Sequence, residues 1–339
     1  MGHYQIENQR YVSSKPAIHV QGPQQMPTRR HILKTTAVLT AAHTLQPFTF
    51  ADEDSDMTAA SPFGFCFNTS TVRGQKLKLD EQVDLVIEAG YDGIEPWIRD
   101  IQAYVDAGGN LQDLNKKLAD ANVKMTSAIG FARWIVDDET ERTKALETAK
   151  HDMALVKQLG GTHIAAPPIG AVDIEGFDLF AAAERYHALC EVGRQAGVIP
   201  QLELWGFSKT LSRLGELAFV STESGHPDAC VLPDIYHIYK GGSDFTGLAM
   251  LNGKRIHCFH VNDYPADPPR STIADKDRVH VGDGIAPVSK ILQMIYESGC
   301  RGMLSLELFN PTYWKQDAMQ VATEGLAKVK AAVAKAFPQ

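Results

Sequence analysis

The feature of this sequence that most constrains its fold is a repeated alternation of short β-rich runs with longer amphipathic ones. From Pro62 onward, each short run is rich in aromatic, β-branched or small apolar residues. Such runs, set between helical patterns, are typical of buried parallel strands. The predicted strands are Phe63–Phe67, Gly93–Trp97, Lys124–Gly130, Thr162–Pro167, Pro200–Trp205, Cys230–Asp234, Ile256–Asn262 and Met303–Phe309.

Helices are predicted between these strands, because apolar residues recur there three and four positions apart. Gly90, Gly160 and Gly197 follow such segments, and glycine readily adopts the left-handed conformation that ends a helix. Eight strand–helix repeats predict a single (β/α)8 TIM barrel. A doubly wound open sheet is the alternative, but no G-x-G-x-x-G follows the first strand. The clearest predicted helices are Leu79–Ala89, Leu111–Asn122, Thr140–Leu159 and Phe177–Ala196.

Composition narrows the class of protein. The chain has 339 residues, enough for one barrel of about 250 residues and an extension. Its net charge of -8 disfavours nucleic acid as a partner, because binding a phosphate backbone requires clustered Lys and Arg. The five cysteines include no C-x-x-C pair, so they are predicted to be buried core thiols and not a zinc knuckle or a disulfide framework.

Residues 1–61 are interpreted as an N-terminal extension, and residues 62–339 as the catalytic barrel. Within the extension, Arg29-Arg30 and Ile32-Leu33-Lys34 precede a moderately apolar run, 35–51, that has no Asp, Glu, Lys or Arg. This order is typical of a twin-arginine export signal, here spanning about residues 26–51. The run is too short and too polar for a stable membrane span. We therefore expect export by the twin-arginine route to the periplasm; a chance arginine pair before a short hydrophobic helix is the alternative.

The last four predicted strands each carry one ionisable residue among apolar neighbours: Glu203, Asp234, His260 and Glu307. Catalytic groups of this barrel lie at the carboxyl ends of the strands. Because an unpaired buried charge is costly, four such positions predict a group that neutralises them. Three carboxylates and one imidazole suit one divalent metal ion, Mn, Co, Mg or Zn. Taken singly, His260 fits a hydrogen-bonded core histidine and Glu307 a salt bridge at the barrel rim.

Short motifs at the strand ends run along nearly the whole barrel. They include Cys66-Phe67-Asn68, Gly90-Tyr91-Asp92-Gly93-Ile94-Glu95, Glu203-Leu204-Trp205-Gly206, Asp234-Ile235-Tyr236-His237, His260-Val261-Asn262-Asp263 and Leu306-Glu307-Leu308-Phe309. In these motifs the chain resembles the xylose-isomerase-like barrel superfamily of sugar isomerases and epimerases. Within it, the chain is most similar to the inosose (2-keto-myo-inositol) isomerases. The metal ligands of the superfamily fall on the four strand-end positions named above.

The resemblance implies a divalent-metal-dependent isomerase or epimerase of a keto-sugar or keto-inositol. Glu203 and Glu307 are then both metal ligands and the catalytic pair that moves a proton through a metal-stabilised enediolate. By the same resemblance, His237 contacts a substrate hydroxyl and Arg278 contacts substrate oxygens. Support of the ligands or a rim salt bridge is the alternative role for both. The implied partner is a small-molecule keto-sugar or keto-polyol, and a homo-oligomer is left open.

Two further positions concern substrate choice. Lys209 stands where related ketose epimerases carry a further glutamate, six residues after the ligand on the fifth strand. We predict a substrate-binding role for Lys209, with a solvated surface lysine as the alternative. Trp205 is predicted to form a stacking wall for a sugar ring together with Trp97 and Trp134, unless these rings pack at the barrel rim.

Three other functions stay open. One is an exported metal-dependent lyase or hydrolase acting on 3-keto-glycosides, which would share the metal and the base but release a leaving group. Another is a non-catalytic sugar-binding barrel, which is expected to have lost one of the two glutamates, whereas both are present. The third is phosphodiester chemistry of the endonuclease IV type. It requires more metal ligands and a basic groove, which this acidic chain does not offer.

Overall fold

The centre of the fold is a ring of eight parallel strands. The computed structural model describes residues 61–338. Pairing runs in the order β3-β2-β1-β8-β7 and, in a second group, β4-β5-β6. Single bridges close the ring: Ala128 with Ile164 links the β3 segment to β4, and Asp234 with His260 links the β6 segment to β7. The strands are β1 Gly64–Asn68, β2 Gly93–Glu95, β3 Lys124–Met125, β4 His163–Ala166, β5 Ile199–Glu203, β6 Cys230–Leu232, β7 Cys258–Val261 and β8 Met303–Leu306.

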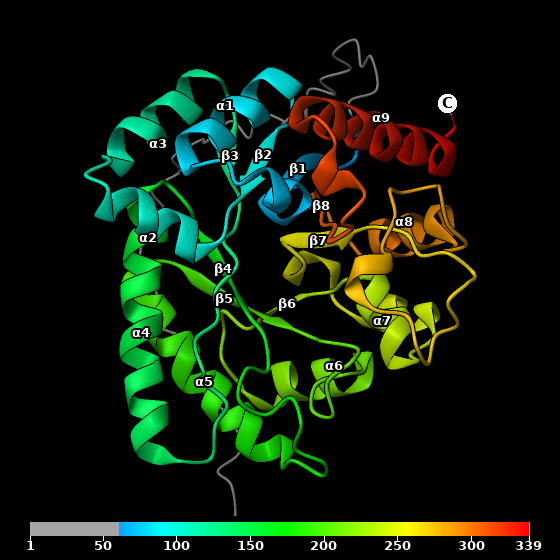
Figure 1. The fold of residues 1–339 in the computed structure, drawn as a ribbon. Coiled ribbons are helices and arrows are strands. Elements are labelled where there is room, and N and C mark those ends of the chain that lie inside the picture. The colour runs from blue at the N-terminus through cyan, green and yellow to red at the C-terminus, as the bar shows by residue number, and fades with distance from the viewer. Residues whose placement is uncertain (1–60, 339) are drawn as a thin grey trace, which may run out of the picture. The chain divides into compact units, whose positions relative to one another are not determined.

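Helices surround this ring, as Figure 1 shows. Those before β5 are α1 Leu79–Ala89, α2 Ile98–Asp106, α3 Leu111–Asp120, α4 Glu139–Gln158 and α5 Leu179–Ala196. Those after it are α6 Leu214–Glu223, α7 Ile235–Gly241, α8 Val288–Glu297 and α9 Ala318–Ala336. Short 3-10 turns lie at Thr69–Gln75, Phe245–Met250, Gly253–Arg255, Asp275–Asp277 and Tyr313–Lys315. The predicted (β/α)8 barrel is confirmed.

Local sequence explains where several helices begin and end. The side chains of Asn110, Asp138 and Asp178 cap α3, α4 and α5 by accepting hydrogen bonds from backbone N–H groups of the first turn. Gly90 and Gly197 end α1 and α5 with φ angles of 81° and 70°, which glycine adopts without steric cost. The predicted and observed bounds of α1 are therefore identical.

Seven of the eight observed strands end earlier than predicted, most clearly β3, whereas β1 extends one residue further, to Asn68. Ala128 and Ile129 lie within the predicted third strand and are buried, but each makes only an isolated bridge. Both residues are apolar because they are buried, although the regular hydrogen-bond ladder of β3 has already ended before them. An apolar run therefore predicts where a strand lies better than where it ends.

The core lies between the strands and the helices and extends into the ring. A small apolar cluster consists of Trp97, Ile129, Ala165, Leu232 and Cys258, contributed by five different strand segments. All five cysteines of the chain are free and buried, which confirms the predicted core thiols.

The predicted extension, 1–61, lies almost wholly outside the described residues, and so does the predicted twin-arginine signal. Within residues 61–338, none of the helices is long and apolar enough to cross a membrane.

Two histidine rings lie next to each other, tilted by 31°, at the amino ends of β4 and β7. The rings of His163 and His257 have centroids 4.3 Å apart, and both line a cavity of about 1140 Å³. Because catalytic groups of this fold lie at the opposite end of the strands, this cavity is not the candidate active site. Burial, and then the nearby His257, lowers the pKa of His163 to about 4. The folded protein therefore resists protonation of His163.

We predict that His163 makes the fold sensitive to acid. Its pKa is depressed in the folded state, so the unfolded chain binds its proton first as the pH falls. The free energy of unfolding should therefore decrease between about pH 6.5 and pH 4, by at most about 3 kcal/mol from this residue. His163→Gln should flatten that decrease in denaturant titrations at several pH values. His151→Gln, at an exposed position on α4, is the control; equal slopes in the two variants would contradict the prediction.

Candidate metal centre and active site

The carboxyl ends of four neighbouring strands bring the predicted ligands into the barrel mouth. Glu203 is the last residue of β5, and Glu307 directly follows β8. His260 lies within β7. Asp234 follows β6 by two residues and is the N-cap of α7, where its side chain accepts a hydrogen bond from the His237 N–H at 2.7 Å. All four side chains are buried.

Three of these residues form a compact group. Asp234, His260 and Glu307 each offer a ligand atom, and these atoms lie within 4.8 Å of one another. Nδ1 of His260 is 3.3 Å from Oε2 of Glu307 and 3.7 Å from Oδ2 of Asp234. Glu203 is not part of that group, but it is close enough for all three to shift its pKa. The structure thus places all four predicted ligands in one region.

The electrostatics of the group favour added positive charge. Burial raises the pKa of Glu203 to about 8; Glu307 and Asp234 act in the same direction, while His260 opposes them. Burial alone would lower the pKa of His260, but Glu307 and Glu95 outweigh it and raise this pKa well above its ordinary value. Because both pKa values are raised, Glu203 and His260 tend to keep their protons, which partly offsets the negative charge of the buried carboxylates.

The residues present fit a divalent cation. Oε2 of Glu203 and Nδ1 of His260 are buried, and neither has a hydrogen-bond partner among the described residues. Buried polar atoms are rarely left unpaired, so both atoms are available as ligands. Carboxylate oxygens with one imidazole nitrogen suit a hard or borderline ion. Glu203, Asp234, His260 and Glu307 would hold it.

Arg278 is the charged partner of this group and is itself fully buried. Its NH1 donates to Oδ2 of Asp234 at 3.1 Å and to Oε2 of Glu307 at 2.7 Å. Its guanidinium lies 4.4 Å from the ring centroid of Tyr236 and 5.0 Å from that of Phe309. Burial disfavours the charge, but Asp234 and other nearby carboxylates raise the pKa of Arg278. Arg278 is therefore a fixed cation beside two predicted ligands.

His237 joins this network. Its Nε2 accepts a hydrogen bond from NH2 of Arg278 at 3.0 Å, because a guanidinium only donates, and its Nδ1 lies 3.3 Å from the backbone nitrogen of Gly206. Burial lowers the pKa of His237 to about 3, so its ring is neutral. The predicted substrate contacts His237 and Arg278 are thus adjacent to the candidate ligands. Arg278 donates to Asp234 through its side chain and His237 through its backbone N–H.

Two of the three tryptophans predicted to form a stacking wall lie next to Phe131, and their role in stacking a sugar ring stays a prediction. Trp205 and Trp97 flank Phe131, with ring centroids 6.4 Å and 5.0 Å from it, so these rings form a continuous aromatic edge. The prediction is wrong for Trp134, whose side chain is fully buried. Its indole N–H donates to the Pro167 carbonyl at 2.9 Å. An indole near a strand end can face the helices as well as the barrel mouth, and its sequence position does not distinguish the two.

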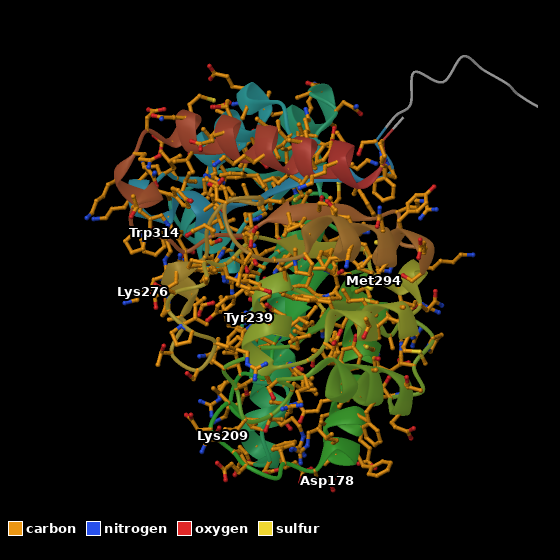
Figure 2. All side chains as sticks on the ribbon, turned by 90° about the vertical axis from the view of Figure 1, so that its right-hand side faces the viewer. Asp178, Lys209, Tyr239, Lys276, Met294 and Trp314 are labelled. Atoms are coloured by element: carbon orange, nitrogen blue, oxygen red, sulfur yellow. The ribbon has the colours of Figure 1, made fainter. Side chains whose placement is uncertain are left out.

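Lys209 lies on the surface, as Figure 2 shows. Its Nζ forms an ion pair with Oε1 of Glu175 at 2.9 Å, and Glu175 and Asp173 are the charged groups that raise its pKa. This arrangement favours the surface alternative, and a role in substrate binding stays a prediction.

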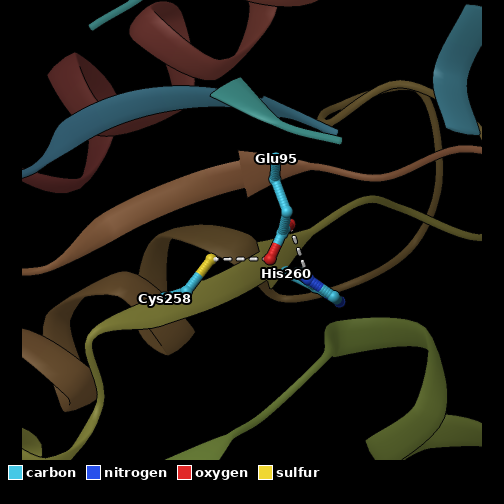
Figure 3. Close-up of side chains that lie close together, drawn as sticks. All are labelled: Glu95, Cys258 and His260. Carbon is cyan, nitrogen blue, oxygen red and sulfur yellow. Dashed lines mark hydrogen bonds and ion pairs between the residues drawn. The ribbon is translucent and has the colours of Figure 1, made fainter. Parts of the chain in front are cut away.

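Sequence reasoning did not identify Glu95 as a partner of the candidate ligands. Glu95 ends β2 and is fully buried, and its Oε2 is 2.9 Å from Nε2 of His260 (Figure 3). The signal that finds it is the same as for the four candidate ligands: an ionisable residue at the end of an apolar strand. Asn68 at the end of β1 and Ser305 within β8 also donate to Glu95.

Residues 83–332 match the xylose isomerase-like TIM barrel family. The chain belongs to this family. An inosose isomerase from Bacillus velezensis is 25% identical over 275 residues, which cover 80% of this chain and 98% of that protein. A 3-dehydroshikimate dehydratase from Pseudomonas putida is 22% identical over 249 residues, covering 73% of this chain and 39% of that protein.

Solved structures share the fold of this chain. The crystal structure of the IolI protein with a bound zinc atom superimposes with a TM-score of 0.75 at 23% identity. The match covers 82% of this chain and 100% of that one.

We predict that bound metal depends on Asp234 and His260. Asp234→Ala or His260→Ala removes one ligand and leaves the remaining buried carboxylates to repel one another. The loss of affinity should exceed the roughly 10–100-fold typical of changes to residues behind the ligands. Elemental analysis of the purified variants measures it. Asp113→Ala and His151→Ala, at exposed positions on α3 and α4, are the controls; full occupancy in either site variant would refute the assignment.

Proposed function

We propose that the protein is a divalent-metal-dependent isomerase or epimerase of a keto-sugar or keto-inositol. The observation that carries this proposal is the placement of two buried glutamates, Glu203 and Glu307, beside His260 and Asp234 at the carboxyl end of the barrel. The inosose isomerase from Bacillus velezensis matches over nearly its whole length, which supports this class of reaction. Among Mn, Co, Mg and Zn, the bound atom of the IolI structure supports zinc.

A bound divalent ion would polarise a substrate carbonyl and make the adjoining C–H more acidic. Glu203 and Glu307 come from β5 and β8, which are separated in the ring by β6 and β7. The two carboxylates therefore reach the site from different sides, so one can remove a proton and the other can return it. Arg278, held by Asp234 and Glu307, is placed to bind substrate oxygens, and the neutral ring of His237 to contact a hydroxyl.

We predict that Glu203→Gln and Glu307→Gln each lower turnover roughly 100-fold or more, the effect expected for loss of general acid–base catalysis. Each substitution keeps an oxygen that can bind a cation but cannot take a proton. The measurement is uptake of deuterium from D2O into keto-inositols and ketoses by variants verified to contain metal. Glu147→Gln, at an exposed position on α4, should exchange at the native rate. If a metal-loaded site variant also does so, that glutamate is not a base.

The second candidate is an elimination that begins with the same proton abstraction, as in a lyase acting on 3-keto-glycosides. The match to a 3-dehydroshikimate dehydratase supports it, since a dehydration releases a leaving group after the C–H bond is broken. Product analysis separates the two: an isomerase returns a product of unchanged mass, and a lyase splits the substrate.

We further propose export of the folded enzyme by the twin-arginine route. The support is the order of Arg29-Arg30, Ile32-Leu33-Lys34 and the uncharged run, 35–51. Replacing both arginines by lysine preserves the charge and should retain the protein in the cytoplasm, as measured by immunoblotting of cell fractions. A host that lacks the twin-arginine translocase should retain the unmodified protein in the same way. Periplasmic recovery in either case would contradict this route.

A further inference from the structure

Glu95 lies behind His260, and its Oε2 accepts hydrogen bonds from three side chains. Its Oε2 is 2.9 Å from Nε2 of His260, 2.7 Å from Oγ of Ser305 and 3.0 Å from Nδ2 of Asn68. Figure 3 shows the carboxylate of Glu95 reaching the His260 ring. Glu95 and all three donors are fully buried, so water does not compete for these contacts.

This arrangement determines which nitrogen of His260 carries a proton. A carboxylate only accepts, so Nε2 of His260 must donate to Glu95. A cation binds only the neutral ring and therefore displaces the second proton of His260; in that ring the other nitrogen, Nδ1, carries the lone pair. Nδ1 has no hydrogen-bond partner among the described residues and faces Glu307 and Asp234. The contact with Glu95 thus leaves Nδ1 as the ligand atom.

Asn68 connects the same carboxylate to a second ligand. Its Nδ2 donates to Oε2 of Glu95 and, at 3.1 Å, to Oε1 of Glu307. Its Oδ1 accepts the Ser70 N–H at 3.0 Å, which fixes the orientation of the amide. Because Oε1 of Glu307 is held by Asn68, Oε2 of Glu307 is the oxygen turned toward His260 and Arg278.

We propose that Glu95 is a positioning residue for the metal centre. It fixes the protonated nitrogen of His260 and, through Asn68, the rotation of the Glu307 carboxylate. The two ligands then present Nδ1 and Oε2 to one divalent cation. The inference depends on the proposed function only for the presence of that cation, and it is independent of the substrate and of the reaction.

Cys258 offers a competing arrangement. Its Sγ lies 3.7 Å from Oε1 of Glu95, and Glu95, Cys258 and His260 offer ligand atoms within 4.8 Å of one another. A thiophilic ion could bind there through Nε2 of His260. Against this, Oε2 of Glu95 already faces three donors, and an ion at Nε2 would displace the His260 hydrogen bond while leaving Nδ1 unpaired.

Metal affinity tests the role of Glu95 directly. Glu95→Gln keeps the shape of the side chain but removes the charge that holds the Nε2 proton. It should weaken zinc or manganese binding roughly 10–100-fold in competition with a chromophoric chelator. Glu147→Gln on the surface of α4 is the matched control and should bind as the unmodified protein does. Unchanged affinity in a folded Glu95→Gln variant would overturn the proposal.

The unmodified protein provides a test that does not require a variant to fold. After ¹⁵N-histidine labelling and loading with zinc, NMR should show His260 protonated at Nε2 and bound through Nδ1; the His260→Asn spectrum assigns the signals. Loading with cobalt should give no thiolate-to-cobalt charge-transfer band. Protonation at Nδ1, or a thiolate band, would overturn the proposal in favour of the Cys258 site.

Asn68→Ala separates positioning from general support of the fold. It should weaken metal binding while His260 stays protonated at Nε2, because Glu95 remains in place. Loss of the Nε2 proton in Asn68→Ala would overturn the division of roles between the two residues. None of these measurements uses a substrate. If they give the expected results but the protein has no isomerase activity, only the proposed function is refuted. A protein that binds no divalent ion refutes both proposals.

Discussion

The structure depends on the balance of charge inside the barrel mouth. Glu95, Glu203, Asp234 and Glu307 are all buried there, and burying carboxylates together is unfavourable unless cations and hydrogen-bond donors compensate. Arg278 supplies a permanent positive charge to Asp234 and Glu307. The bridge between Asp234 and His260 also links the β6 segment to β7, so charge compensation and closure of the ring involve the same residues.

Strand β7 and the residues that follow it position both His260 and the loop that carries Arg278. The strand carries His260, and three residues later Asp263 pairs through its backbone with Val279, at 2.9 Å and 3.0 Å. This pairing fixes the loop next to Arg278. The carboxylate of Asp263 also accepts backbone N–H groups of Gly282 and Ala286. Main-chain contacts that begin just after β7, the strand that carries His260, therefore hold Arg278 beside the candidate ligands.

Several parts of the fold and of the site could be predicted from residue type and order. The alternation of patterns located every strand, since burial on both faces leaves a continuous apolar run. The rule that charged residues at strand ends meet placed Glu203, Asp234, His260 and Glu307 together. The same rule missed Glu95 because it was applied to the last four strands only. Trp134 was misplaced because a strand-end position does not say whether an indole faces the helices or the barrel mouth.

The sequence by itself determined the barrel and the kinds of side chain in the candidate ligand set, because both follow from periodicity and from the cost of burying charge. Tertiary structure alone decided which atoms meet. Asn68 lies 239 residues from Glu307 in the chain, yet it donates to that side chain and to Glu95. The tertiary structure also placed Lys209 on the surface, where it pairs with Glu175. Hydrogen bonds of this kind depend on side-chain rotamers and on closure of the ring, which local sequence does not encode.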